Sequence, residues 1–462
     1  MQTYFTDKGQ PDARPIVVLD GQGLKRWLAD APAAARRWVA ETGFAAKPGS
    51  VCLLPDESGG ISGALVGVGP AGGGLRESAS AADQLPAGHY RLETDGVPSA
   101  DLWSVGWSIG QYRFGRYRSA DPSGPRVLVW PDAADQDSVL RHAEADRLVR
   151  DLVNTPAADM GPVELEAEAE RLAAEFGADF RVTEGKDLLK ENFPAIHAVG
   201  RASEQAPRLV DIRWGSPQHP AVTLVGKGVC FDTGGLDIKP AAAMRNMKKD
   251  MGGAAHVLGL ARSVMAAGLP VRLRVLIPAV ENSIAGNAYR PGDVLSTRKG
   301  ITVEIGNTDA EGRIVLCDAL ALADEERPDV IVNMATLTGA ARVALGPELP
   351  ALYSDDDEVA RSISDVCAAE QDPVWHMPLW QPYADSLSSP VADINHISSG
   401  PPMAGSITAA LYLKKFVEQA GAFVHIDLFA WNPRRRPGRP EGAECQSVRG
   451  LFRWLETRYP MR

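Results

Sequence analysis

Residues 305–316 read Ile305-Gly-Asn-Thr-Asp-Ala-Glu-Gly-Arg-Ile-Val-Leu316, a short turn that carries two carboxylates and a guanidinium beside apolar residues. Asp309, Glu311 and Arg313 are two positions apart, so an extended chain would project all three side chains to one side. Such a face could bind a metal ion and an anion. A single Asp-x-Glu is more often a solvated turn, because most charged side chains are exposed. The rest of the chain decides between these two interpretations.

The length and charge of the chain limit what it can be. At 462 residues it exceeds the size that one hydrophobic core usually serves, so we expect at least two domains. Its formal charge of -11 at pH 7 argues against general binding to nucleic acid or to acidic membranes, and we expect small-molecule or peptide partners. The N-terminus lacks the pattern of a signal peptide, and no run approaches the about 18 apolar residues of a spanning helix. We therefore expect a soluble, cytoplasmic protein.

The five cysteines are scattered, and none forms a Cys-x-x-Cys pair. This pattern suggests neither a disulfide framework nor a thiolate zinc site. Cys230 and Cys317 lie beside the motifs described below, but apolar residues flank both of them, as is typical of small core residues. We expect mostly buried, reduced thiols.

The first part of the chain alternates apolar runs with helical patterns. Runs that predict strands occupy residues 16–19, 51–54, 61–68 and 127–129, and residues 23–42 follow a helical pattern. This alternation predicts a smaller N-terminal α/β domain over residues 1–135. The next residues read as one long polar helix closed by Asn154-Thr-Pro156, which predicts a linker helix over 136–153.

The second part of the chain alternates more regularly. Predicted strands occupy residues 195–199, 208–214, 221–225, 271–277, 302–304 and 330–333, and a predicted helix occupies residues 252–267. The pattern predicts a larger α/β/α domain over residues 154–462, in which helices cover both faces of a mixed, mostly parallel central sheet. In such sheets binding sites gather at the carboxyl ends of the strands.

Charged residues on glycine-rich turns follow the predicted strand that ends at Val225. The turns are Gly226-Lys-Gly-Val-Cys-Phe-Asp-Thr-Gly-Gly235, Leu236-Asp-Ile-Lys-Pro240 and Met244-Arg-Asn-Met-Lys-Lys-Asp-Met-Gly-Gly253, with the candidates Lys227, Asp232, Lys239 and Asp250. Together with Asp309 and Glu311, they give four carboxylates and two lysines that one parallel sheet could bring together. Oxygen-rich ligand sets with little histidine suit hard or borderline divalent ions, and several shared carboxylates favour a pair of ions.

The order and spacing of these motifs resemble those of the leucyl (cytosol) aminopeptidase family of two-metal exopeptidases. The resemblance rests on Asn307-Thr-Asp-Ala-Glu-Gly-Arg313, on the Gly-Lys-Gly…Phe-Asp-x-Gly-Gly…Ile-Lys-Pro block of residues 226–240, and on Met247-Lys-x-Asp-Met-Gly-Gly-Ala-Ala255. Looser similarity runs from Arg150 to Ala410 and so covers most of the second domain. The resemblance implies a metallo-exopeptidase fold for that domain, whereas the N-terminal domain matches only weakly.

The resemblance also implies a ligand set for two divalent metal ions per chain, which would be zinc or manganese, with cobalt or magnesium as alternatives. Asp232 and Glu311 would bridge the two ions. Lys227 and Asp250 would complete one site, and Asp309 would complete the other. A lysine binds a metal only as the neutral amine, so the pKa of Lys227 would have to fall far below its free value of about 10.4.

Further residues are implied to act on the substrate of an aminopeptidase that cleaves short peptides. Lys239 would stay cationic and stabilise the developing oxyanion. Arg313 would hold a bicarbonate that acts as general base, and its fork suits a planar anion. The pocket for the first side chain, a moderately wide apolar slot that favours Leu or Met, would be lined by Met247, Thr336, Leu337 and Gly339. The resemblance further implies a homohexamer whose active sites face an interior cavity.

The chain departs from the family pattern in three places, and other classes of protein compete. Thr233 stands where relatives commonly have Ser, the stretch around Leu236 to Asp237 is less typical, and the tail from Phe429 through Arg439 differs more clearly. We expect the basic segment 433–440 to form a rim contact, a subunit contact or a solvated loop.

Two other classes of protein are disfavoured. A two-metal phosphoesterase is disfavoured because such sites usually include histidine ligands. A regulatory or DNA-binding role is disfavoured by the acidic charge and the lack of a long basic stripe.

Overall fold

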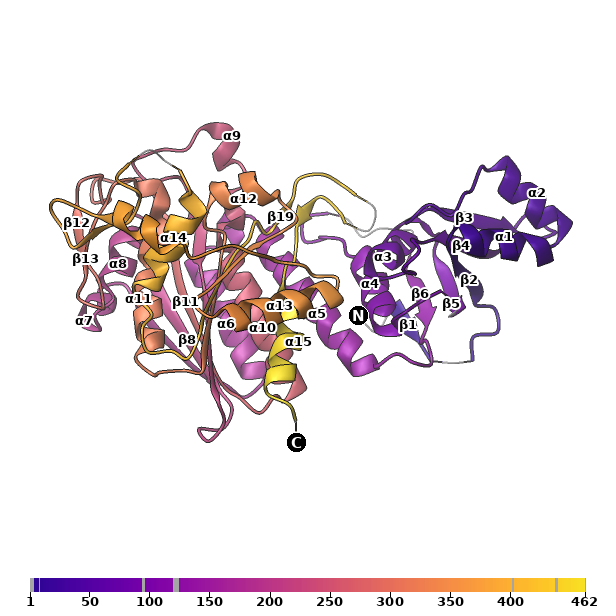
Figure 1. Cartoon of the computed structure of the whole chain (residues 1–462), viewed down its shortest axis with the longest axis horizontal. Helices are drawn as coiled ribbons and strands as arrows, with labels where there is room; N and C mark the ends of the chain where they lie inside the picture. Colours follow the sequence, from indigo (N-terminus) through magenta and orange to yellow (C-terminus); the bar gives the residue numbers. More distant parts are fainter. Residues whose placement is uncertain are drawn as a thin grey trace. The chain divides into compact units, whose positions relative to one another are not determined.

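The computed structural model describes residues 4–7, 9–93, 96–118, 124–400, 403–436 and 439–461. The chain forms two compact units. The first contains Met1–Arg147 and Asn432–Gly442, and the second contains Leu148–Trp431 and Ala443–Arg462 (Figure 1). Most of the basic segment therefore belongs to the first unit, where Arg435 pairs with Asp83, although Gly438 and Pro437 lie outside the described residues. Helix α5 (Gln136–Asn154) carries the chain from the first unit into the second.

The first unit is built on a six-stranded sheet with the order β1-β6-β5-β2-β4-β3. Its strands are β1 (Phe5–Thr6), β2 (Arg14–Leu19), β3 (Val51–Pro55), β4 (Ile61–Gly67), β5 (Gly88–Glu93) and β6 (Arg126–Val129). Its helices are α1 (Gly21–Asp30), α2 (Ala33–Glu41), α3 (Leu75–Gln84) and α4 (Ala100–Gly110). The helical pattern of residues 23–42 is thus two helices, because Pro32 cannot continue the first one and instead precedes the second.

The second unit is built on a nine-stranded sheet with the order β16-β15-β18-β14-β9-β11-β8-β7, in which β10 also pairs with β11. Its strands are β7 (Asp179–Glu184), β8 (Arg208–Trp214), β9 (Ala221–Gly226), β10 (Gly228–Asp232), β11 (Arg272–Asn282), β14 (Val330–Ala335), β15 (Ala351–Ser354), β16 (Trp375–His376) and β18 (Phe423–Asp427). The central strands β18, β14, β9 and β11 are parallel, whereas β8 and β15 pair antiparallel with their inner neighbours. The predicted mixed, mostly parallel sheet is confirmed.

Helices cover both faces of this sheet (Figure 1). One group is α6 (Pro162–Glu175), α10 (Gly252–Ala267), α13 (Asp357–Ala369) and α15 (Val448–Arg458), and the other is α8 (Pro194–Gly200), α11 (Glu311–Asp324) and α14 (Gly405–Lys414). Burial on both faces explains why every residue of β14 is apolar or hydrogen-bonded and buried. The close approach of α10 needs glycine, because a Cβ on Gly253 would lie 2.1 Å from the carbonyl oxygen of Met334.

Smaller elements complete the second unit and the segment around residue 440. They are α7 (Asp187–Lys190), α9 (Ala241–Met244), α12 (Gly339–Leu345), β12 (Val294–Ser296), β13 (Thr302–Glu304), β17 (Ile394–Asn395), β19 (Trp431–Asn432) and β20 (Gly442–Ala443). All five cysteines are free, and all except Cys445 are buried, as predicted. No helix in the described part of the chain is both long and apolar enough to cross a bilayer.

Of the seven elements that the sequence predicts for the second domain, six lie where they are expected and one is wrong. The predicted helix 252–267 and the predicted strands 208–214 and 302–304 have the observed bounds. The predicted strand 195–199 is wrong, because these residues lie in helix α8. Pro194 opens this helix, and the buried carboxylate of Asp318 accepts hydrogen bonds from the backbone N–H groups of Ala195 (2.8 Å) and Ile196 (3.3 Å).

Candidate metal centre

The predicted metal ligands meet at the carboxyl ends of the central strands. Lys227 follows β9, Asp232 ends β10, Asp250 lies in the 3₁₀ turn Met247–Met251, Asp309 lies in the 3₁₀ turn Thr308–Ala310, and Glu311 begins α11. Ligand oxygens of Asp232, Asp309 and Glu311 all lie within 4.8 Å of one another. Strand ends of a parallel sheet are where the chain can turn and present polar groups without breaking the apolar core.

Two lysines hold the four carboxylates of this centre together. Lys227 Nζ lies 2.7 Å from Asp250 Oδ2 and 2.8 Å from Glu311 Oε1. Lys239 Nζ lies 2.8 Å from Asp232 Oδ2 and 2.5 Å from Asp309 Oδ1. Among these six residues, four carboxylates against two ammonium groups leave a formal charge of -2 in a largely buried place, and the neighbouring buried Lys249 offsets only part of it. Because uncompensated buried charge is costly, the cluster is suited to additional cations.

The buried carboxylate of Glu311 lacks the hydrogen bonds that would compensate for its burial among the described residues. It is 1% exposed, and neither of its oxygens makes a hydrogen bond of normal geometry with any described residue. Oε1 has the ammonium of Lys227 2.8 Å away, whereas Oε2 has no hydrogen-bond partner among those residues. Buried carboxylate oxygens are almost always satisfied. A divalent ion that Glu311 shares with Asp232 would satisfy it, so the residues present fit a metal centre.

The pKa values around Lys227 reflect this imbalance of charge. Burial by itself lowers the pKa of Lys227, but Asp250 and Glu311 outweigh burial and raise the pKa above its ordinary value. Burial, followed by repulsion from Asp232, raises the pKa of Glu311 well above its ordinary value although Lys227 opposes the shift. Protein groups alone therefore keep Lys227 protonated and leave Glu311 difficult to ionise. A divalent ion at the same carboxylates would lower the pKa values of both Lys227 and Glu311.

Lys239 has a different environment from Lys227. Its side chain is 13% exposed, so it reaches the surface of the cluster rather than lying inside it. Burial lowers the pKa of Lys239, but attraction to Asp232 and the hydrogen bond to Asp309 raise it above its ordinary value overall. Lys239 is thus a partly exposed cation at neutral pH.

The expectation that residues 309–313 form an extended face is wrong. The side chain of Asn307 accepts a hydrogen bond from Asp309 N (2.8 Å), and the 3₁₀ turn that follows leads directly into α11. Glu311 and Arg313 are therefore about 200° apart around a helix rather than on one side of a strand. A helix start fits here because the buried Glu311 lies at the positive end of the α11 dipole.

Arg313 is a buried guanidinium without an ion-pair partner among the described residues. Its Nη1 donates a hydrogen bond to the carbonyl oxygen of His396 (2.7 Å). Burial lowers the pKa of Arg313 to about 10, so it stays charged at neutral pH. A buried cation with unused donors is suited to bind a small anion.

Of the predicted pocket residues, Thr336 contacts the same cluster directly. Thr336 Oγ1 donates a hydrogen bond to Asp250 Oδ1 (2.9 Å), while Met247 begins the turn that carries Asp250. Leu337 follows Thr336, and Gly339 begins α12. Asp427, at the end of β18, accepts hydrogen bonds from Leu337 N (3.1 Å) and from the Thr338 backbone and hydroxyl group. Asp427 thus fixes the loop that carries these pocket residues.

Sequence reasoning missed Asp427 and also Asn282. Asn282 ends β11, and its Nδ2 donates hydrogen bonds to Asp232 Oδ1 (2.8 Å) and to the carbonyl oxygen of Thr308 (3.0 Å). It therefore joins the turns that carry Asp232 and Asp309. Each missed residue is a polar residue at the end of an apolar strand, which was the only signal available in the sequence.

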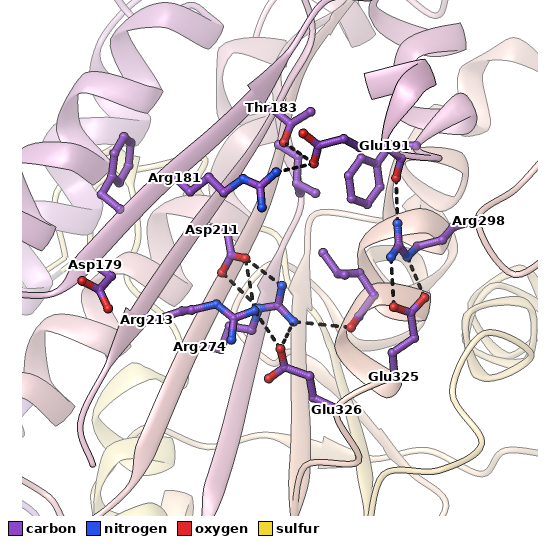
Figure 2. Close-up of a pocket in the computed structure, with 14 residues that line it drawn as sticks. Asp179, Arg181, Thr183, Glu191, Asp211, Arg213, Arg274, Arg298, Glu325 and Glu326 are labelled. Carbon is purple, nitrogen blue, oxygen red and sulfur yellow. Dashed lines mark hydrogen bonds and ion pairs between the residues drawn. The ribbon is translucent and has the colours of Figure 1, made fainter. Parts of the chain in front are cut away.

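The structure contains a pocket of about 520 Å³ that shares no residue with the metal centre. Figure 2 shows that its arginines are paired with neighbouring carboxylates, as in the two hydrogen bonds from Arg274 to Asp211 and the two from Arg298 to Glu325. Arg181 likewise pairs with Glu191. Its labelled guanidinium groups are engaged, so cavity size does not indicate where the chemistry of this protein occurs.

The α/β/α fold and the carboxylate-rich centre define a metal-dependent hydrolase. Residues 147–452 match the catalytic domain of the cytosol aminopeptidase family, and residues 14–130 match the M17 aminopeptidase N-terminal domain. The chain belongs to the cytosol aminopeptidase family (M17), and it is a metal-dependent aminopeptidase. The N-terminal domain, whose sequence resembles the family only weakly, therefore also belongs to it.

Named relatives support this assignment. The chain is 40% identical over 356 residues to Peptidase B of Pectobacterium carotovorum, covering 74% of this chain and 80% of that protein. It is similar to the crystal structure of cytosol aminopeptidase from Coxiella burnetii, with a TM-score of 0.94, 45% identity, and coverage of 98% of this chain and 99% of that one. It is also similar to the bottromycin maturation enzyme BotP in complex with Mn, with a TM-score of 0.87, 33% identity, and coverage of 97% and 100%.

Proposed function

We propose that this enzyme releases N-terminal amino acids from short peptides and that it binds two divalent ions per chain. The ligands are Lys227, Asp232, Asp250, Asp309 and Glu311. The observation that carries the proposal is the buried cluster of four carboxylates and two lysines, with its excess negative charge and the unsatisfied Glu311. Zinc or manganese suits these ligands, and a structural relative is described as a complex with Mn.

Different residues of this chain would have different roles in peptide hydrolysis. Bound divalent ions lower the pKa of a water molecule and polarise the scissile carbonyl. Asn282 holds Asp232 in position through the hydrogen bond described above. Lys239, cationic and partly exposed, would donate to the oxygen that becomes negative in the tetrahedral intermediate. Arg313 would hold a bicarbonate, which would supply a general base, because its guanidinium is charged and buried without an ion-pair partner among the described residues.

The assignment is tested by metal reconstitution. Purified enzyme that has been stripped of metal is assayed with a panel of aminoacyl-p-nitroanilides and dipeptides after zinc, manganese, cobalt or magnesium is added. Activity should return with at least one of these ions and should be greatest on substrates with an apolar first residue. A phosphate-ester substrate assayed in parallel should stay intact, and hydrolysis of that ester alone would exclude the aminopeptidase assignment.

Free N-terminal amines should be required for cleavage. The α-amine would bind a metal ion, so its acetylation should lower kcat/KM for Leu-p-nitroanilide by about 10²-fold or more, the loss expected for one strong interaction at the reacting centre. Unblocked Leu and Met substrates should also be cleaved faster than Asp and Glu substrates, because Met247 and Gly339 are proposed to line an apolar slot. Steady-state kinetics check both points. Equal rates for blocked and free Leu substrates would contradict the exopeptidase geometry.

The location and assembly of the enzyme are further parts of the proposal. A cytoplasmic location is supported by the similarity to a protein described as a cytosol aminopeptidase. A homohexamer is supported by the resemblance to the leucyl aminopeptidases, and it would restrict access to short, unfolded peptides. Light scattering of the purified enzyme should give a mass of six chains, and a monomer at micromolar concentration would contradict the assembly.

A further inference from the structure

The segment 428–430 lies opposite the proposed pocket residue Thr336. A Cβ on Gly252 would lie 2.6 Å from Ala430 Cβ and 2.9 Å from Thr336 Cγ2. The side chains of Ala430 and Thr336 therefore both pack directly against Gly252. The N–H of Leu428 donates to the carbonyl oxygen of Ala335 (2.9 Å), which keeps the segment beside the end of β14. Residues 428–430 therefore form a wall that faces the loop of Thr336 and Leu337.

This wall contains a strained residue. Ala430 has a φ of 56°, in the left-handed region that residues with a side chain rarely adopt. Such a conformation persists only where the surrounding structure holds it in place. The hydrogen bonds of the wall are therefore expected to determine its position.

Gln446 supplies those hydrogen bonds from behind the wall. Its side chain is buried, and Oε1 accepts from Phe429 N (3.2 Å) and Ala430 N (2.9 Å). Nε2 donates to the carbonyl oxygen of Pro347 (3.0 Å), in the loop that follows α12. One buried amide thus connects the wall to the end of the helix that begins at Gly339.

His256 anchors Gln446 to the helix that follows the metal centre. Its Nε2 accepts a hydrogen bond from Gln446 N (3.0 Å), and its Nδ1 donates to the carbonyl oxygen of Gly252 (2.6 Å). Burial lowers the pKa of His256 to about 4, so the ring is neutral at pH 7 and keeps one donor and one acceptor. Since His256 lies in α10, Gln446 is held in register with the helix that follows Asp250.

We propose that Gln446 is a positioning residue that fixes the wall 428–430 and thereby controls which N-terminal side chains the enzyme accepts. This inference rests on the pocket placement given under Proposed function. Gln446 acts through the backbone of Phe429 and Ala430 and needs no contact with substrate. A glutamine that only stabilised the fold would affect all substrates alike, whereas a positioning residue changes the relative use of large and small side chains.

The test compares Leu-p-nitroanilide with Ala-p-nitroanilide in Gln446→Ala. KM for the Leu substrate should rise by about 10-fold, the usual cost of a poor apolar fit, while kcat/KM for the Ala substrate stays within about 2-fold. Metal content should be unchanged. Gln446→Glu keeps an acceptor for the two N–H groups and should retain the preference for Leu. Gln446→Met fills the same space without an acceptor and gives the same readout if the alanine variant is unstable.

Two controls separate this inference from general destabilisation and from an error in the pocket. Asp372→Ala removes hydrogen bonds from Ser447 N (2.8 Å) and Arg449 N (3.1 Å), next to Gln446 but away from the wall, and should affect both substrates equally. Met247→Ala alters the proposed pocket directly. If Met247→Ala changes the Leu preference and neither Gln446→Ala nor Gln446→Met does, the inference is overturned and the pocket stands. If none of these variants changes it, the pocket placement fails as well.

Discussion

Glu311→Gln should lower kcat/KM for Leu-p-nitroanilide by about 10³-fold or more, because it removes a charge that two metal ions are proposed to share. The carboxylate is buried and lacks normal hydrogen bonds to the described residues, so an amide of the same shape leaves the packing intact. The variant should also bind both ions more weakly, because Glu311 is proposed to be a ligand of both and an amide oxygen carries no charge. Kinetics and metal analysis of the same preparation check both effects.

The same carboxylate-to-amide change at the other end of α11 is the matched control. Glu325 pairs with Arg298 on the surface, and Glu325→Gln should leave activity and metal content near those of the parent enzyme. A chelator should abolish the activity of the parent enzyme, and divalent ions should restore it. Full activity after prolonged dialysis against excess chelator would exclude the two-metal proposal.

Lys239→Ala and Lys227→Ala should have different consequences, although both lysines lie in the same cluster. Lys239→Ala should lower kcat by about 10²- to 10³-fold, the usual cost of one oxyanion donor, and should keep about two ions per chain. Lys227→Ala should lose or weaken one ion, because its amine is proposed as a ligand. Lys227 lies inside the cluster between Asp250 and Glu311, whereas the side chain of Lys239 is partly exposed.

Metal stoichiometry measured beside kcat distinguishes the two lysines. Lys190→Ala, which removes an exposed lysine paired with Asp187, controls for the loss of a positive charge and should change neither quantity. If Lys239→Ala loses metal and Lys227→Ala does not, the two roles are reversed. Unchanged activity in both variants would show that this loop is not catalytic.

Features that depend on local pattern could be predicted from the order of residues. Apolar runs and helical spacing predicted β8, β13 and α10 with their observed bounds. The reason is that the periodicity of apolar residues along a short segment reflects which of its faces are buried. Motif order gave the family and the five candidate ligands, and the structure brings these residues together. Their roles as ligands stay predictions, since the fold places them but does not test what they bind.

Features that depend on distant partners became visible only in the folded chain. Residues 194–200 form a helix rather than a strand because Asp318, more than a hundred residues away, accepts the hydrogen bonds of its first turn. Asn282 and Gln446 were missed for the same reason, since the groups they bind belong to other segments of the chain. Hydrophobic patterning shows which face of an element is buried. Only the folded chain determines which distant polar group a buried donor or acceptor will meet, because that pairing follows from the packing of whole elements.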